Sequence, residues 1–132
     1  MEAWSLHMLA LVQIGHDDAG EAIVHAREAL RIFHQAGDVG GITLILDDLA
    51  SIAVSSGDPP RAGRLYGAAR HLQSTSGTTL ALFVEETYKQ YNAPSPRSVL
   101  GPEEFERYAA EGASMGLDEV VAYALEDPAP VP

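Results

Sequence analysis

Four histidines recur every nine residues near the start of the chain, at His7, His16, His25 and His34. Imidazole is a common zinc ligand, so this spacing raises the question of a metal site. Nine residues make two and a half helical turns, which puts His25 and His34 on opposite sides of one helix. His7 and His25 could face each other across a hairpin, but His16 would then lie about 13 Å away. The spacing therefore favours ordinary histidines, and we expect neither a bound metal nor a cofactor.

Two adjacent carboxylates, Asp47 and Asp48, are the other candidates for chemistry, because carboxylates with separated pKa values perform acid–base catalysis. Neighbouring residues on a helix point about 100° apart, so adjacency alone does not let them share a proton. Asp47 is expected opposite an apolar stripe, where one interpretation is a solvated face. The other is a concave, partner-binding surface lined by Thr43, Asp47, Asp48 and Ser51. Ser51 lies in no G-x-S-x-G motif, and we expect no catalytic residues.

The elements that position these residues are set by two Gly-Asp steps, Gly37-Asp38 and Gly57-Asp58. The apolar residues between them recur at the spacing of one helical face. Glycine favours the left-handed conformation that follows a helix end, and aspartate caps the free N–H groups that begin the next helix. Pro59 suits the first position of that next helix. Because such short connections make neighbouring helices antiparallel, each Gly-Asp step predicts a tight turn between packed helices.

The same pattern predicts an all-α protein of about seven helices, with antiparallel hairpins stacked as an α–α superhelix. A weak internal repeat supports this arrangement, because Glu28–Asp38 and Gly67–Gly77 align at an offset of about 40 residues. We expect a single domain over 1–127, with hairpins at 2–36 and 39–76, C-terminal helices over 80–127, and a disordered tail at 128–132.

Two glycines, Gly63 and Gly67, fall inside the helix predicted over 59–75. Each costs about 1 kcal/mol relative to alanine in a helix interior. Close approach of a neighbouring helix would offset that cost. A later helix is expected to open at Pro102 and to end at Gly112 or Gly116.

Composition limits the classes of function. The 132 residues are enough for one core without disulfides, and the absence of cysteine fits a reducing compartment, with the cytoplasm as the expected location. Eight basic against nineteen acidic residues give a net charge of −11, which repels phosphate and argues against direct nucleic-acid binding. The N-terminal apolar run lacks a basic start and is too short for a bilayer, so we expect no membrane association.

The first predicted helix is apolar on most sides. Trp4, Met8 and Leu11 share one face, and Leu9 and Val12 occupy another, which we expect to pack on the following helix. Trp4, Met8 and Leu11 would then have no partner within the chain. An apolar patch of this kind usually marks an interface, so these three residues predict self-association as a homodimer.

The stretch "LRIFHQAGDVGGITLILDDLASIAVSSGDPPRAGRLYGAARHL", followed by "LGPEEFERYAAEGASMGLDEVVAYALE", resembles a known family. It is similar to the C-terminal tetratricopeptide-like (TPR-like) region of bacterial LuxR-type and AfsR-like signal-transduction ATPases that regulate transcription. The resemblance covers most of the chain and rests on the paired Gly-Asp steps, the "RAGRLYGAAR" helix and the closing "LDEVVAYAL" segment. It implies a helical scaffold that receives signals or partners. The family's phosphate-binding G-x-x-x-x-G-K-[ST] motif is missing from this sequence, so the resemblance does not extend to ATPase activity.

These observations favour a non-enzymatic protein-interaction and regulatory module that binds a protein partner. The alternative is a small-molecule sensor that holds its ligand in a groove between hairpins. A deep, enclosed apolar pocket with convergent polar groups would favour the sensor, and a shallow acidic groove would favour the scaffold.

Overall fold

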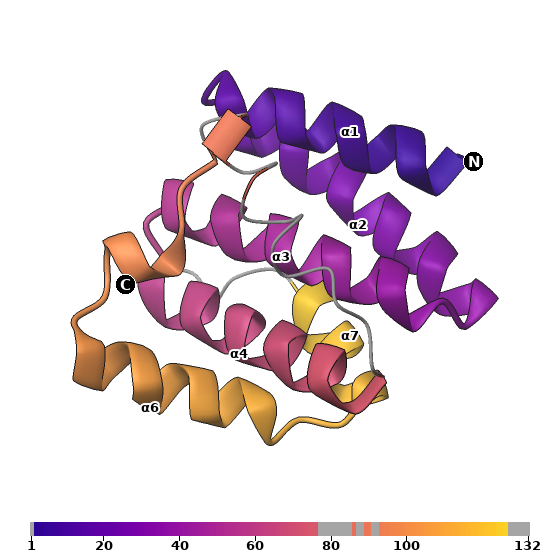
Figure 1. Ribbon diagram of the computed structural model, residues 1–132. Coiled ribbons are helices and arrows are strands. Elements are labelled where there is room, and N and C mark those ends of the chain that lie inside the picture. Colours follow the sequence, from indigo (N-terminus) through magenta and orange to yellow (C-terminus); the bar gives the residue numbers. More distant parts are fainter. Residues whose placement is uncertain (1, 77–85, 87–88, 91–92, 127–132) are drawn as a thin grey trace.

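A computed structural model describes residues 2–76, 86, 89–90 and 93–126 (Figure 1). In these ranges the protein is all-helical, which confirms the expected fold class. Six α-helices and one short 3₁₀ helix are described, close to the expected seven: α1 Glu2–Gly15, α2 Ala19–Ala36, α3 Val39–Ser55, α4 Pro59–Ser76, η1 Pro96–Ser98, α6 Pro102–Ala113 and α7 Leu117–Leu125. The helix expected over 80–91 falls almost entirely outside the described residues, and so does the tail at 128–132. None of the described helices is long and apolar enough to cross a membrane.

Three turns of one kind join the first four helices. Residues 17, 37 and 57, spaced by twenty, all have positive φ (61°, 68° and 78°), and an aspartate follows each of them. The amide of that aspartate donates to a carbonyl five residues back, at Gln13, Phe33 and Ala53, in the manner of a Schellman motif. The aspartate side chains of Asp18, Asp38 and Asp58 then accept from the first turn of the next helix.

These turns confirm the role proposed for Gly37 and Gly57, and the first turn has the same form without a glycine at the left-handed position. Gly15 is the last residue of α1, and Asp17 takes the left-handed position. Aspartate tolerates that conformation better than most residues, so no glycine is needed there. The repeat is also visible in the helices, because α2 and α4 are both eighteen residues long and begin 40 residues apart, at Ala19 and Pro59.

The helices form an array in which each packs on the next, from α1 through α2, α3 and α4 to α6, while α7 lies behind α3 and α4 (Figure 1). Helix α3 occupies the centre. Every residue from Gly41 to Ala53 on it is buried, including the expected apolar stripe. The core of the domain therefore surrounds α3 on all sides.

Helices α4 and α6 cross at unusually close range through glycines. A Cβ atom on Gly67 would lie 2.0 Å from the backbone oxygen of Ala109, and one on Gly112 would lie 1.8 Å from that of Arg64. At Gly63 the nearest atom would be the Cβ of Tyr108, at 2.7 Å. The expected close approach at Gly63 and Gly67 is therefore present, with α6 as the neighbouring helix.

Gly112 does not end α6, which corrects one of the two expected ends. The helix continues to Ala113, and Gly112 lies at the crossing, where the close approach of α4 requires a glycine.

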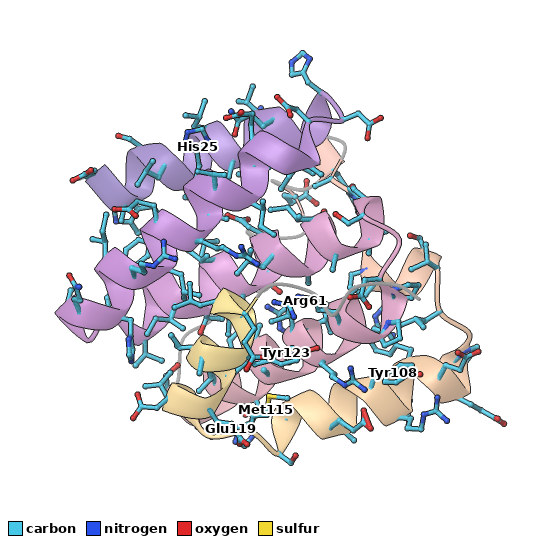
Figure 2. The ribbon with its side chains drawn as sticks, turned by 180° about the vertical axis from the view of Figure 1, so that it is seen from behind. His25, Arg61, Tyr108, Met115, Glu119 and Tyr123 are labelled. Atoms are coloured by element: carbon cyan, nitrogen blue, oxygen red, sulfur yellow. The ribbon has the colours of Figure 1, made fainter. Side chains whose placement is uncertain are left out.

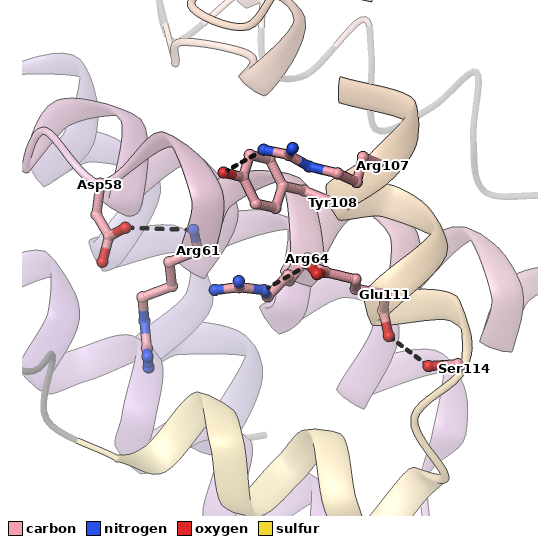
Figure 3. A network of polar contacts seen from close by, with 7 residues as sticks. All are labelled: Asp58, Arg61, Arg64, Arg107, Tyr108, Glu111 and Ser114. Carbon is pink, nitrogen blue, oxygen red and sulfur yellow. Dashed lines mark hydrogen bonds and ion pairs between the residues drawn. The ribbon is translucent and has the colours of Figure 1, made fainter. Parts of the chain in front are cut away.

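Polar contacts flank the crossing of α4 and α6 (Figure 3). Arg64 donates to Glu111 at 3.1 Å, and the guanidinium groups of Arg64 and Arg107 lie 5.1 and 4.7 Å from the centroid of the Tyr108 ring. The glycines set the helix separation, and these partly exposed side chains cover its edge.

We predict that Gly67→Leu lowers the free energy of unfolding by about 1–3 kcal/mol, because the new side chain meets the α6 backbone, which cannot rotate away as a side chain can. Urea denaturation followed by circular dichroism measures the change. Gly20→Ala is the matched control, since a Cβ there has no neighbour within 4 Å. The control should be unchanged or gain up to about 1 kcal/mol of helix propensity. A Gly67→Leu variant as stable as the wild type would contradict the close crossing.

Candidate functional site

The polar residues of α3 that sequence analysis singled out are inside the protein. Asp47 is 3% exposed and Asp48 is 0% exposed, so the expectation of a solvated face for Asp47 is wrong. Thr43 and Ser51 are buried as well. The sequence period identified the apolar stripe of α3 correctly, but it could not show that other helices also cover the opposite side.

Each buried carboxylate has a basic partner from a different helix. Asp48 pairs with Nδ1 of His7 on α1, and Asp47 pairs with the guanidinium of Arg70 on α4. The two adjacent side chains thus point to different neighbours and do not share a proton. Both pairs tie α3 to the helices that flank it.

The hydroxyl groups of the other two predicted site residues donate to backbone carbonyls, one distant in the sequence and one local. The Ser51 hydroxyl donates to the carbonyl of Pro94 at 2.7 Å, which fixes the segment leading to η1 against α3. The Thr43 hydroxyl donates to the Val39 carbonyl one turn earlier, at 2.9 Å. These contacts occupy Thr43, Asp47, Asp48 and Ser51 within the fold, and the proposal that they bind a partner stays a prediction.

Burial raises the pKa of Asp47 from 3.8 to about 7, and the charge of Asp48 adds to the rise, whereas the charge and hydrogen bond of Arg70 lower it. A carboxyl group with a pKa near neutrality is often catalytic when it faces a cleft. Asp47 lines neither the groove along Arg97 and Phe105 nor the small cavity beside Arg61. Its position between helices indicates a structural pair.

The four regularly spaced histidines diverge in space. His7 contacts Asp48, His25 contacts Oε1 of Gln13 at 2.8 Å, and Nε2 of His34 lies 3.0 Å from a carboxylate oxygen of Asp118. His16 is exposed at the first turn. Among the described residues no group of three or more metal-ligating side chains comes together.

One motif escaped sequence analysis. Gly112, Ser114 and Gly116 form the pattern G-x-S-x-G, which in hydrolases marks a nucleophilic serine on a strand-to-helix turn. Here the segment joins two helices, α6 and α7, and the Ser114 hydroxyl donates to the carbonyl of Glu111 at 2.7 Å. The structural context of the motif is therefore a helix C-terminus and not a nucleophile elbow.

Two hollows bear on the sensor alternative. A groove of about 260 Å³ is open to solvent and lies between η1 and α6, along Arg97, Leu100 and Phe105. A cavity of about 30 Å³, which is close to the volume of one water molecule, lies between α2, α3 and α4 beside Arg61. Neither has the enclosed shape and size that a small-molecule site requires.

The outer face of α1 is a stronger candidate for a binding surface. Its exposed apolar side chains are between 40% and 48% exposed and comprise Trp4, Met8, Leu9 and Val12. Leu11, which was expected on the exposed face, is fully buried, whereas Leu9 and Val12 were expected to pack inward and do not. Trp4 is held partly inward, because its ring meets the ring of Phe33 edge to face at 5.7 Å. We call these four residues the α1 face.

The reversal on α1 has a physical reason. The helix buries Ala3 and Ala10 beside the alanines of α2, Ala22, Ala26 and Ala29, and the same face also buries His7, Leu11 and Ile14. Small residues let the two backbones approach closely, and the choice of this buried face leaves the α1 face on the opposite side of the helix. The signal available in the sequence was the spacing of Ala3, His7, Ala10 and Ile14 along one face.

The sequence is similar to one portion of much longer proteins. Over 112 residues it is 30% identical to proteins named "Putative HTH-type transcriptional regulator" from Mycobacterium bovis and from Mycobacterium tuberculosis strains CDC 1551 and H37Rv. The match covers 85% of this chain and 12% of each relative, so the chain spans about an eighth of their length. No family model matches the sequence, and no solved structure matches it significantly.

We predict that the buried carboxyl of Asp47 makes the protein less stable as the pH rises. Because its pKa is higher in the folded state than in the unfolded state, its protonation favours folding below about pH 4, and this contribution is lost as the pH passes about 7. Asp47→Asn removes the titration, so the loss of stability between pH 5 and pH 8 should be smaller than in the wild type. Urea denaturation at both pH values measures the difference.

The control for this prediction is Asp17→Asn, which removes an exposed carboxyl at a position where asparagine also tolerates positive φ. It should keep the pH dependence of the wild type. Equal pH dependence in the wild type and in Asp47→Asn would contradict the assignment of a raised pKa to Asp47.

Proposed function

We propose that this chain is a non-enzymatic protein-interaction module that serves transcription regulation, and that the α1 face is its contact surface. The observation that carries the proposal is the row of large apolar side chains on the outside of α1, because exposed apolar patches of this kind mark interaction sites. The stacked hairpins support a TPR-like scaffold, an architecture built for binding. The similarity to mycobacterial HTH-type regulators supports the regulatory context, and a cytoplasmic location is part of the same proposal.

The absence of charged side chains from the α1 face permits a second copy of the chain as its occupant. With a net charge of −11, two copies repel each other over most approaches. Residues 3–15 contain no Asp, Glu, Lys or Arg, and the histidine among them, His7, is buried. The α1 face is therefore a neutral surface on which two acidic chains can meet without opposing like charges. A two-fold axis would pair each face with its copy as an isologous dimer.

The size of the face sets the expected strength. A helix of fourteen residues is about 21 Å long, so two paired helices bury much less than the roughly 1,200 Å² typical of stable complexes. We therefore expect a weak dimer that dissociates on dilution. Weak self-association is useful in a regulator, because a modest change in local concentration changes the fraction that is paired.

Light scattering coupled to size exclusion, across a concentration series from low to high micromolar, tests this proposal. The wild-type mass should rise from that of a monomer toward that of a dimer. The Met8→Glu/Val12→Glu variant should stay monomeric, because pairing of two α1 faces would bring the new carboxylates of both copies together. Trp4 is left unchanged because it contacts Phe33.

The control is Val24→Glu/Val99→Glu, which adds the same charge at two other exposed valines, and it should behave as the wild type does. A wild-type chain that is monomeric throughout the series, with the same mass as Met8→Glu/Val12→Glu, would overturn the assignment of the α1 face.

A further inference from the structure

Helix α7 is held on the domain both by its buried apolar side chains and by hydrogen bonds to the carbonyl groups at its end. The guanidinium of Arg61 on α4 donates to the carbonyl oxygens of Tyr123 at 2.9 Å, Ala124 at 3.2 Å and Glu126 at 3.0 Å. Arg27 on α2 donates to the Glu126 carbonyl at 2.8 Å. The last carbonyls of any α-helix lack partners within the helix and carry partial negative charge, so two arginines at this point recognise a helix end as such.

The seat of α7 is a surface made by three other helices. Val120, Val121 and Ala124 are buried against α2, α3 and α4, so α7 lies there as an amphipathic peptide lies in a groove. Figure 2 shows α7 on this side of the molecule, with Tyr123 beside Arg61, whose guanidinium lies 4.7 Å from the centroid of the ring. We call the surface beneath these residues the α7 groove.

Helix α7 is too short to be stable by itself. Helix α7 has nine residues, fewer than an isolated helix needs to be stable in water, so its helical state depends on docking. At its start, Gly116 has no side chain to cap the helix, and the cap is limited to one hydrogen bond, from the Gly116 amide to Oε1 of Glu119 at 3.3 Å. A short helix of this kind is able to leave as a unit at a lower free-energy cost than global unfolding.

We propose that α7 is a latch that occupies a helix-binding groove and gives way to an amphipathic helix of a protein partner. When α7 leaves, Arg61 loses three acceptors and Val120, Val121 and Ala124 uncover an apolar surface. A helix from a partner that has an apolar stripe and unpaired carbonyl groups at its C-terminus restores the apolar packing and the hydrogen bonds from Arg61. The groove therefore selects a partner by helix geometry and apolar spacing. This site lies apart from the α1 face and does not depend on it.

The chain contains no cysteine, so single cysteines report opening without interference. Ala124→Cys places a thiol under the latch, and Ala69→Cys places one in the core on α4; both alanines are 0% exposed. Under native conditions a thiol reagent should label Cys at position 124 faster than at position 69 by about tenfold or more, because the latch opens without global unfolding. Arg27→Gln should raise the labelling rate at position 124 and leave the rate at position 69 unchanged. Arg61→Gln should raise the rate at position 124 by a larger factor.

A synthetic peptide with the sequence of 117–126, LDEVVAYALE, supplies the partner helix in trans. Added to the full chain at millimolar concentration, it should trap the open state and raise the labelling rate at position 124 but not at 69. The control peptide carries aspartate in place of both valines and should have no effect. Equal labelling at 124 and 69 overturns the latch, and a peptide that leaves labelling at 124 unchanged overturns the helix-binding groove.

Discussion

Moving a carboxylate from water into a protein interior is costly unless a cation and hydrogen bonds replace the lost water, and α3 carries two carboxylates side by side through its buried centre. His7 of α1 and Arg70 of α4 supply the partners, one from each flank. Such buried pairs add little net stability, but losing one partner leaves an uncompensated charge. The two pairs therefore reject arrangements in which either flanking helix slides along α3.

Small residues add a second constraint to that of the buried pairs Asp48–His7 and Asp47–Arg70. Alanines at the α1–α2 contact and glycines at the α4–α6 crossing let backbones approach closely, so large side chains are needed mainly around α3. On α1 the buried face holds Leu11 and Ile14 as well as alanines, and the α1 face lies on the other side of the helix. The packing of the buried side of α1 on α2 fixes which side chains α1 exposes. The same packing leaves those exposed side chains available for binding.

The local features of this fold could be predicted from sequence, because they depend on neighbours along the chain. The Gly-Asp steps, the Pro59 helix start and the close contact at Gly67 all belong to this group. The burial of Asp47 could not be predicted, since helical periodicity identifies one apolar face and says nothing of what covers the other. The hydrogen bond from Arg61 to Tyr123 also could not be predicted. It joins residues that are 62 apart, and its acceptor is a backbone carbonyl, which every residue has.

The two candidate surfaces recognise partners by different physical means, and this difference suits a regulator. The α1 face offers uncharged apolar area, so its strength depends on protein concentration and on the excess of like charge elsewhere. The α7 groove offers aligned hydrogen-bond donors at the end of a helix seat, so its selectivity depends on where the incoming helix terminates. A helix that ends one turn too early leaves buried Arg61 without acceptors and forfeits the affinity that its apolar stripe supplies.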